Sequence, residues 1–128
     1  MDNHSKIVNA LLALLTRKND DAFVIIKQLP TKKFVQFAGS ITTPLLLDLP
    51  SQTLSEIEFY RAVKLFQQMG IEGSEYDLLD QPDGEVIGQQ FTFNVVCNSA
   101  ASGANLAEKI FTTVYEFPID CDIDLIEN

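Results

Sequence analysis

The sequence predicts a single α+β domain, an antiparallel five-stranded sheet with three helices in the order α-β-β-β-α-β-β-α. Two observations lead to this class. The chain has 128 residues, 46% of them hydrophobic, which is enough for one core. Segments whose apolar residues recur at helical spacing also alternate with short runs rich in β-branched and aromatic residues.

The N-terminal part begins with a predicted helix at about residues 6–17, with Ser5 as its cap. The helix has a wide apolar face, formed by Ile7, Val8, Leu11, Leu12, Leu14 and Leu15. Turns then separate three predicted strands at residues 23–29, 34–37 and 45–49. Connections as short as these favour an antiparallel meander.

The second helix carries the strongest local signals. Thr53-Leu54-Ser55-Glu56 is a predicted capping box at its start, and Gly70 is the predicted stop. An apolar stripe recurs along it at helical spacing: Phe59, Ala62, Val63, Phe66 and Met69. Because helix packing requires such a stripe, we interpret it as core and not as a ligand site.

A hairpin and a third helix complete the predicted domain. Pro82-Asp83-Gly84 indicates the hairpin turn, and Gly88 predicts a bulge in the second arm. Asn98 or Ser99 caps a helix at about residues 100–115. Its buried stripe contains small residues that permit close approach to a sheet: Ala104, Ala107, Phe111 and Val114.

The last residues have a different character, so we divide the chain into a domain at 1–117 and an acidic extension at 118–128. From Glu116 to Asn128 there are five acids and no base. The segment 120–124 begins like a calcium loop, but Leu125 stands where that loop requires glycine. Its alternation of apolar and acidic residues favours an edge strand or extended tail, which could pair as a sixth strand or be displaced from a groove by a partner.

The residues offer little catalytic chemistry. His4 is the sole histidine, and we expect it in a frayed stretch without a rigid base or nucleophile beside it. Cys97 and Cys121 match no zinc spacing and are expected to be free thiols. The glycines form no phosphate cradle. We therefore predict a chain that is not an enzyme, with no catalytic residue, no metal and no cofactor.

Charge narrows the range of partners. The net charge is −9, with +3 on residues 1–33 and −12 on residues 34–128. Such an acidic chain repels phosphate backbones, so we expect that it does not bind nucleic acid. The apolar stretch at residues 7–15 is too short to span a bilayer, and basic residues follow it in place of a cleavage site. We therefore expect no membrane insertion, and we expect the protein to be cytoplasmic.

Three segments resemble a known fold. The second strand of that fold resembles Lys33-Phe34-Val35-Gln36-Phe37. Its third strand and second helix resemble residues 45–50 and 66–71, and its closing helix resembles residues 104–116. The fold is that of the type III secretion chaperones, closest to the TY-Chap and YbjN-like domains, and the resemblance covers about residues 5–117. It implies a small homodimer that binds an extended client segment along apolar grooves and strand edges, without turnover.

The predicted function is therefore a non-enzymatic protein-binding module of chaperone or assembly-factor type. The alternative is a small-ligand-binding or regulatory domain that uses a cavity between helices and sheet. Because residues 45–47 and 95–96 place apolar bulk on both faces of the sheet, a client or second copy should cover the second face, and we expect a homodimer across that face or the second helix. Acidic residues are the predicted partner-binding set, steering a basic or amphipathic client: Asp77, Asp80, Glu85, Asp120, Asp122 and Asp124.

Overall fold

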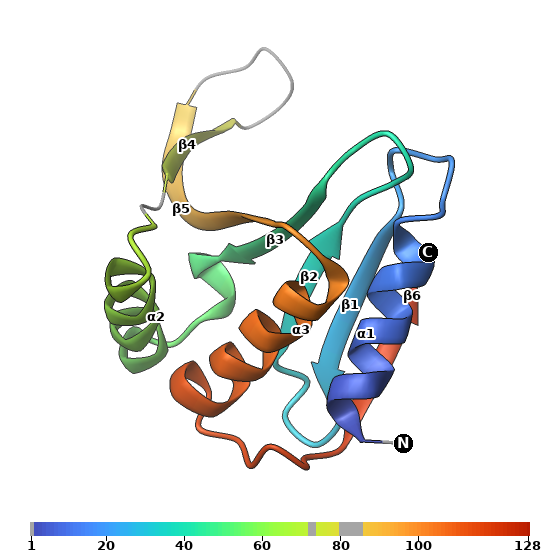
Figure 1. The fold of residues 1–128 in the computed structure, drawn as a ribbon. Coiled ribbons are helices and arrows are strands. Elements are labelled where there is room, and N and C mark those ends of the chain that lie inside the picture. Colours follow the sequence, from blue (N-terminus) through green and yellow to red (C-terminus); the bar gives the residue numbers. More distant parts are fainter. Residues whose placement is uncertain (1, 72–73, 80–85) are drawn as a thin grey trace.

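The computed structural model describes residues 2–71, 74–79 and 86–128 (Figure 1). Their strands form one antiparallel sheet in the order β4-β5-β3-β2-β1-β6. The elements are α1 (Asn3–Leu14), β1 (Phe23–Gln28), β2 (Phe34–Ala38), β3 (Leu45–Pro50), a 3-10 turn (Ser51–Thr53), α2 (Glu56–Gln68), β4 (Ser74–Leu79), β5 (Val86–Cys97), α3 (Ala100–Lys109), a π-helical turn (Ile110–Val114) and β6 (Ile123–Glu127).

The predicted α+β class and the order α-β-β-β-α-β-β-α are confirmed, and the acidic tail adds a strand to that arrangement. β6 pairs antiparallel with β1, so that Leu125 lies opposite Ile26 and Asp124 opposite Lys27. This pairing is one of the arrangements that the alternation in the tail predicts. β6 thus forms one edge of the sheet, and β4 forms the other.

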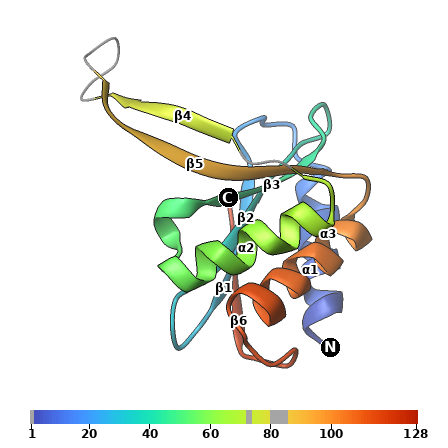
Figure 2. The ribbon, with the colours of Figure 1, turned by 90° about the vertical axis from the view of Figure 1, so that its left-hand side faces the viewer.

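All three helices lie on the same face of the sheet, and within the described residues the opposite face carries no helix (Figures 1 and 2). The core lies between the helices and the inward residues of the strands. Val24, Ile26, Val35, Phe37 and Leu47 are each at most 1% exposed. Strict alternation of buried and less buried residues along β1, β2 and β3 follows from the two-residue period of a strand.

Small residues bring α3 close to the sheet, as the sequence predicts. Ala104 and Ala107 are fully buried. A Cβ atom at Gly103 would lie 2.9 Å from side-chain methyl groups of both Leu11 and Leu45. α3 therefore touches α1 and β3 at a distance that only glycine allows at this position.

The predicted helix starts need correction. α1 begins at Asn3 and ends at Leu14, so the N-terminal stretch is not frayed, and Asp2 is its cap because its carboxylate accepts a hydrogen bond from the Ser5 N–H at 2.8 Å. The capping box of α2 consists of Ser55 and Glu58 instead of residues 53 and 56. In both helices, another acceptor within three residues of the predicted cap was in position to satisfy the free backbone N–H groups.

Other predicted signals are confirmed. Gly70 follows α2 with a φ of 73°, and Ser99 caps α3. The β4–β5 pairing skips one residue beside Gly88, as expected for a bulge. The predicted turn at Pro82-Asp83-Gly84 lies outside the described residues. Among the described residues, no helix has the length and hydropathy needed to cross a membrane.

Candidate functional site

The predicted acidic residues do not form one patch. Asp77 belongs to β4, whereas Asp124 belongs to β6 at the opposite edge of the sheet. Asp120 and Asp122 lie in the loop that leads into β6 and line one cavity together. Asp80 and Glu85 lie outside the described residues. A single acidic surface of all six residues is therefore not what the described part of the chain shows.

The open face of the sheet carries a row of apolar residues that crosses four strands. Phe23 on β1 lies opposite Ala38 on β2, Ala38 opposite Leu46 on β3, and Leu46 opposite Val96 on β5. Val96 is 61% exposed, and the other three are partly exposed. We call these four residues the apolar row. Most one-sided sheets place polar residues on the face without helices, so this row is unusual.

A second row, parallel to the apolar row, is largely polar. Ile25 on β1 is followed across the sheet by Gln36, Asp48 and Asn94. The Asp48 carboxylate accepts a hydrogen bond from the Thr92 hydroxyl at 2.6 Å. The open face thus combines an apolar strip with side-chain amides that can pair with the backbone of a bound segment.

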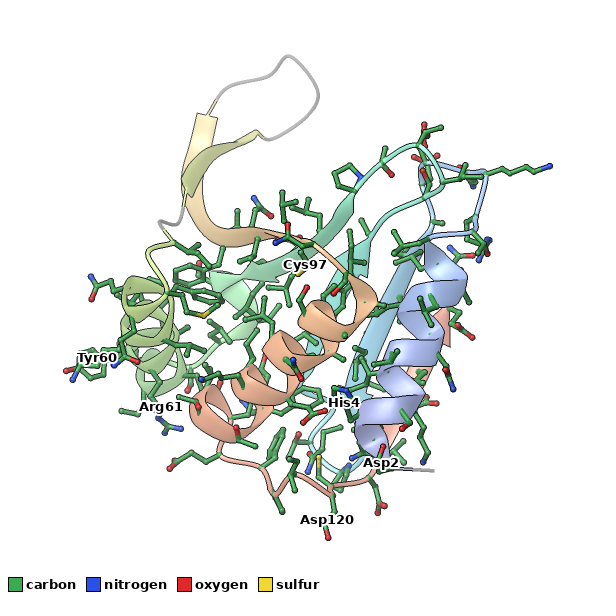
Figure 3. All side chains as sticks on the ribbon, in the orientation of Figure 1. Asp2, His4, Tyr60, Arg61, Cys97 and Asp120 are labelled. Atoms are coloured by element: carbon green, nitrogen blue, oxygen red, sulfur yellow. The ribbon has the colours of Figure 1, made fainter. Side chains whose placement is uncertain are left out.

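Another exposed apolar surface lies on α2. Ile57 and Tyr60 are 55% and 54% exposed, and the ammonium of Lys64 lies 4.9 Å from the centre of the Tyr60 ring. The buried side of the same helix carries Phe66, whose ring stacks on Phe93 at a centroid distance of 4.5 Å. Figure 3 shows Tyr60 pointing away from the body of the molecule. The predicted stripe did not include Ile57 or Tyr60.

A cavity of about 440 Å³ lies between the start of α1, the end of α3 and the loop before β6. Its polar lining includes Lys6, Asp120 and Asp122, and its apolar lining includes Leu29 and Ile119. Figure 3 places Asp2, His4 and Asp120 at this end of the molecule. The cavity borders the tail, beside the start of α1, the end of α3 and the start of β6.

His4 has a partner that the sequence did not indicate. Its Nδ1 atom lies 2.6 Å from Oε1 of Glu108 on α3. The side chain of His4 is 40% exposed and that of Glu108 is 18% exposed. The pair joins the first turn of α1 to the last turn of α3, and it became visible only when the two helices were placed side by side.

The thiols are poorly suited to nucleophilic chemistry. Burial raises the pKa of the Cys97 thiol. Burial, together with the negative charges of Asp120 and Asp122, raises the pKa of Cys121. Since the thiolate is the nucleophile, both free cysteines remain protonated at neutral pH. Within the described residues, no group of three or more His, Cys, Asp or Glu side chains could hold a metal ion.

A buried ion pair fixes α2 to the covered side of the sheet. The Lys33 ammonium donates to the Glu58 carboxylate at 2.7 Å, and the Ser55 N–H donates to the same carboxylate at 2.9 Å. Burial alone would raise the pKa of Glu58, but these two donors outweigh it and hold the pKa below its usual value. Tyr115 lies beside the pair and donates its hydroxyl proton to the carbonyl of Phe34 at 2.8 Å. This network is structural.

Comparisons of the chain with protein-family models, with curated proteins and with solved structures find no match. Function is therefore inferred from the surfaces described above. Of these, the open sheet face and the second helix were expected as partner surfaces, whereas the His4–Glu108 pair was not.

Proposed function

We propose that the chain is a non-enzymatic protein-binding module of chaperone or assembly-factor type, which holds an extended segment of a client protein across the open face of its sheet. The observation that carries this proposal is the apolar row of Phe23, Ala38, Leu46 and Val96. Neighbouring strands lie about 4.8 Å apart, so the row spans about 15 Å, the length of four or five extended residues.

The surroundings of the row support an extended client. Apolar side chains of the client would bury the row, which supplies affinity. The amides of Gln36 and Asn94 lie one row away and offer both donors and acceptors to client backbone groups. The raised pKa values of both thiols argue against nucleophilic catalysis by cysteine.

The exposed α2 surface supports the homodimer as part of the same proposal. A two-fold interface uses the same patch on both copies. If α2 pairs antiparallel with its copy, the acidic first turn with Glu56 meets the half that carries Lys64, and Ile57 and Tyr60 become buried. Light scattering of the full chain would then give twice the 14.3 kDa mass, and Tyr60→Glu would restore the single mass.

The test of client binding compares two substitutions on one strand face. Val96→Asp places a charge in the apolar row, whereas Asn94→Asp places the same charge two residues away on the same face. Polypeptides that co-purify from native lysate are identified, and peptides from the main one are used to measure affinity. We expect Val96→Asp to weaken binding by at least about tenfold, the equivalent of about 1.4 kcal/mol, and Asn94→Asp, which replaces one side-chain amide but leaves the apolar row intact, to weaken it clearly less. Equal affinity of both variants would contradict the proposal.

The alternative function, small-ligand binding, is favoured by the cavity of about 440 Å³ at the start of α1. Its carboxylates and apolar walls suit a cationic ligand with an apolar body. A rise in melting temperature with such amines, lost in Asp120→Asn with Asp122→Asn, would favour this function over client binding.

A further inference from the structure

The edge strand β6 is less buried than β1, β2 and β3, the strands inside the sheet. Its inward residues Ile123 and Leu125 are only partly buried. A cavity of about 440 Å³ lies beside its lead-in loop, and a shallow, open depression between α1 and β6 is lined by Lys6, Leu125 and Glu127. Because the inward side chains of β6 are only partly buried, releasing this strand costs less packing than releasing an inner strand.

The loop before β6 is held by a few identifiable bonds. The side-chain amide of Asn3 donates to the carbonyl of Cys121 at 2.6 Å and to that of Ile119 at 3.3 Å. Just upstream, Glu116 adopts a φ of 59°, which is unusual for a residue other than glycine.

Charge complementarity joins β6 to the edge that it covers. Residues 118–128 carry Asp120, Asp122, Asp124 and Glu127 and no base. The part of the chain that they meet is basic, with a net charge of +3 over residues 1–33. Lys27 lies directly opposite Asp124, and Lys6 lines both the cavity and the depression. Of the tail acids, Asp124 therefore faces one of the chain's own lysines across the sheet.

We propose that the edge of β1 is a binding site for an extended acidic segment of a partner protein, and that residues 118–128 occupy this site as a tethered competitor. The partner segment pairs antiparallel with β1, places apolar residues at the positions of Ile123 and Leu125, and places a carboxylate opposite Lys27. This site is separate from the open face, so it stands whether or not that face binds a client.

The tether sets the expected strength of the competition. A short linker gives the tail an effective concentration of about 1 mM or more at its own site, so a free segment gains access only when β6 is released. A disulfide lock that holds β6 on β1 should then weaken binding of a free segment, and its reduction should restore binding.

Such a lock can be designed from the register. Phe23 and Asn128 exchange two backbone hydrogen bonds at 3.1 and 3.0 Å, so Ile25 and Ile126, two positions further along, form the next hydrogen-bonded pair. The Cα atoms of such a pair are about 5.5 Å apart, within the range for a disulfide. Ile25→Cys with Ile126→Cys, made with Cys121→Ser, therefore closes the edge on oxidation.

The experiment measures binding of a labelled peptide of residues 118–128, with serine at position 121, to the full chain at low salt. Because the free peptide competes with the tethered tail, it is used up to millimolar concentration, where it should bind the reduced lock variant; oxidation should weaken binding by at least about tenfold, and reduction should restore it. The control is Ala38→Cys with Leu46→Cys in the same Cys121→Ser background, which links β2 to β3, and its oxidation should change nothing. Circular dichroism confirms that each variant is folded.

A second peptide tests the charge. Replacing its three aspartates by asparagine should weaken binding at low salt, and the difference should vanish at high salt. Equal binding to the oxidised and reduced locks, or no binding by the reduced chain, would overturn the proposal. A dimer that dissociates when the lock is oxidised would also overturn it, by assigning the edge to the tail of a second copy.

Discussion

The two faces of the sheet are built from alternate residues of the same strands, yet they meet different surroundings. On the covered face, Val24 and Leu47 are at most 1% exposed. On the open face, Val96 is 61% exposed, and Leu46 keeps part of its surface in water. Both faces are apolar in composition over much of their area. Hydrophobicity therefore does not by itself separate a residue that builds the core from one that is available to a partner.

The largest contrast is expected between neighbouring leucines of β3. Leu47→Ala removes a fully buried side chain and should lower the free energy of unfolding by about 2–5 kcal/mol. Leu46→Ala removes a partly exposed one and should cost about 1 kcal/mol. Urea unfolding of both variants measures the two losses. Equal losses would mean that the open face is covered in solution.

The covered side also holds a buried carboxylate, that of Glu58. Its contribution to the free energy of unfolding therefore depends on pH. The pKa of Glu58 lies below its usual value of 4.5, so the stability from its ion pair is fully present above that pH and is lost as the pH falls through the lowered pKa. Glu58→Gln should cost about 1.5–3 kcal/mol near neutral pH, since hydrogen bonds to a charged group are lost. The difference from the wild type should shrink in acid.

Urea unfolding at a series of pH values checks this expectation. Glu56→Gln is the matched control, because Glu56 lies in the same first turn but is exposed. A cost of Glu58→Gln that stays constant through the acid range would show that the carboxylate is not held charged by Lys33.

The packing of α3 on the sheet gives a further test of the covered side. Gly103→Ala places a methyl group 2.9 Å from methyl carbons of Leu11 and Leu45 and 3.3 Å from the ring of Phe37. Because these are ends of side chains, they can move apart, and we expect a loss of about 1–3 kcal/mol. Thermal unfolding measures it, with the exposed Ala101→Gly as a comparison for helix propensity. An unchanged melting temperature would show that α3 lies further from the sheet.

The smallest change in stability is expected on the open face, as the same valine-to-threonine substitution on each face would show. Val96→Thr, on the open face, should change the stability by less than about 0.5 kcal/mol. Val24→Thr buries a hydroxyl group on the covered face and should cost about 1–3 kcal/mol. Denaturant midpoints separate the two. A large cost at Val96 would place that residue inside an interface.

Part of the candidate site could be predicted from the sequence. The runs at residues 45–47 and 95–96 indicate apolar bulk on both faces, because successive residues of a strand point in opposite directions. The six acids were grouped by their common charge, and their sequence positions do not show that β4 and β6 lie at opposite edges. The pairing of His4 with Glu108 joins residues 104 positions apart and leaves no local signal.

The sequence by itself determined the type and order of the elements, the stop of α2 at Gly70 and the small residues of α3, because these depend on local spacing and backbone preference. The tertiary structure alone decided the strand register, and with it the apolar row and the position of β6. Strand pairing joins distant residues, and a shift of one residue would turn every side chain of a strand to the other face. That is why Leu46 and Val96 meet on the open face, while Leu47 and Val95 meet under the helices.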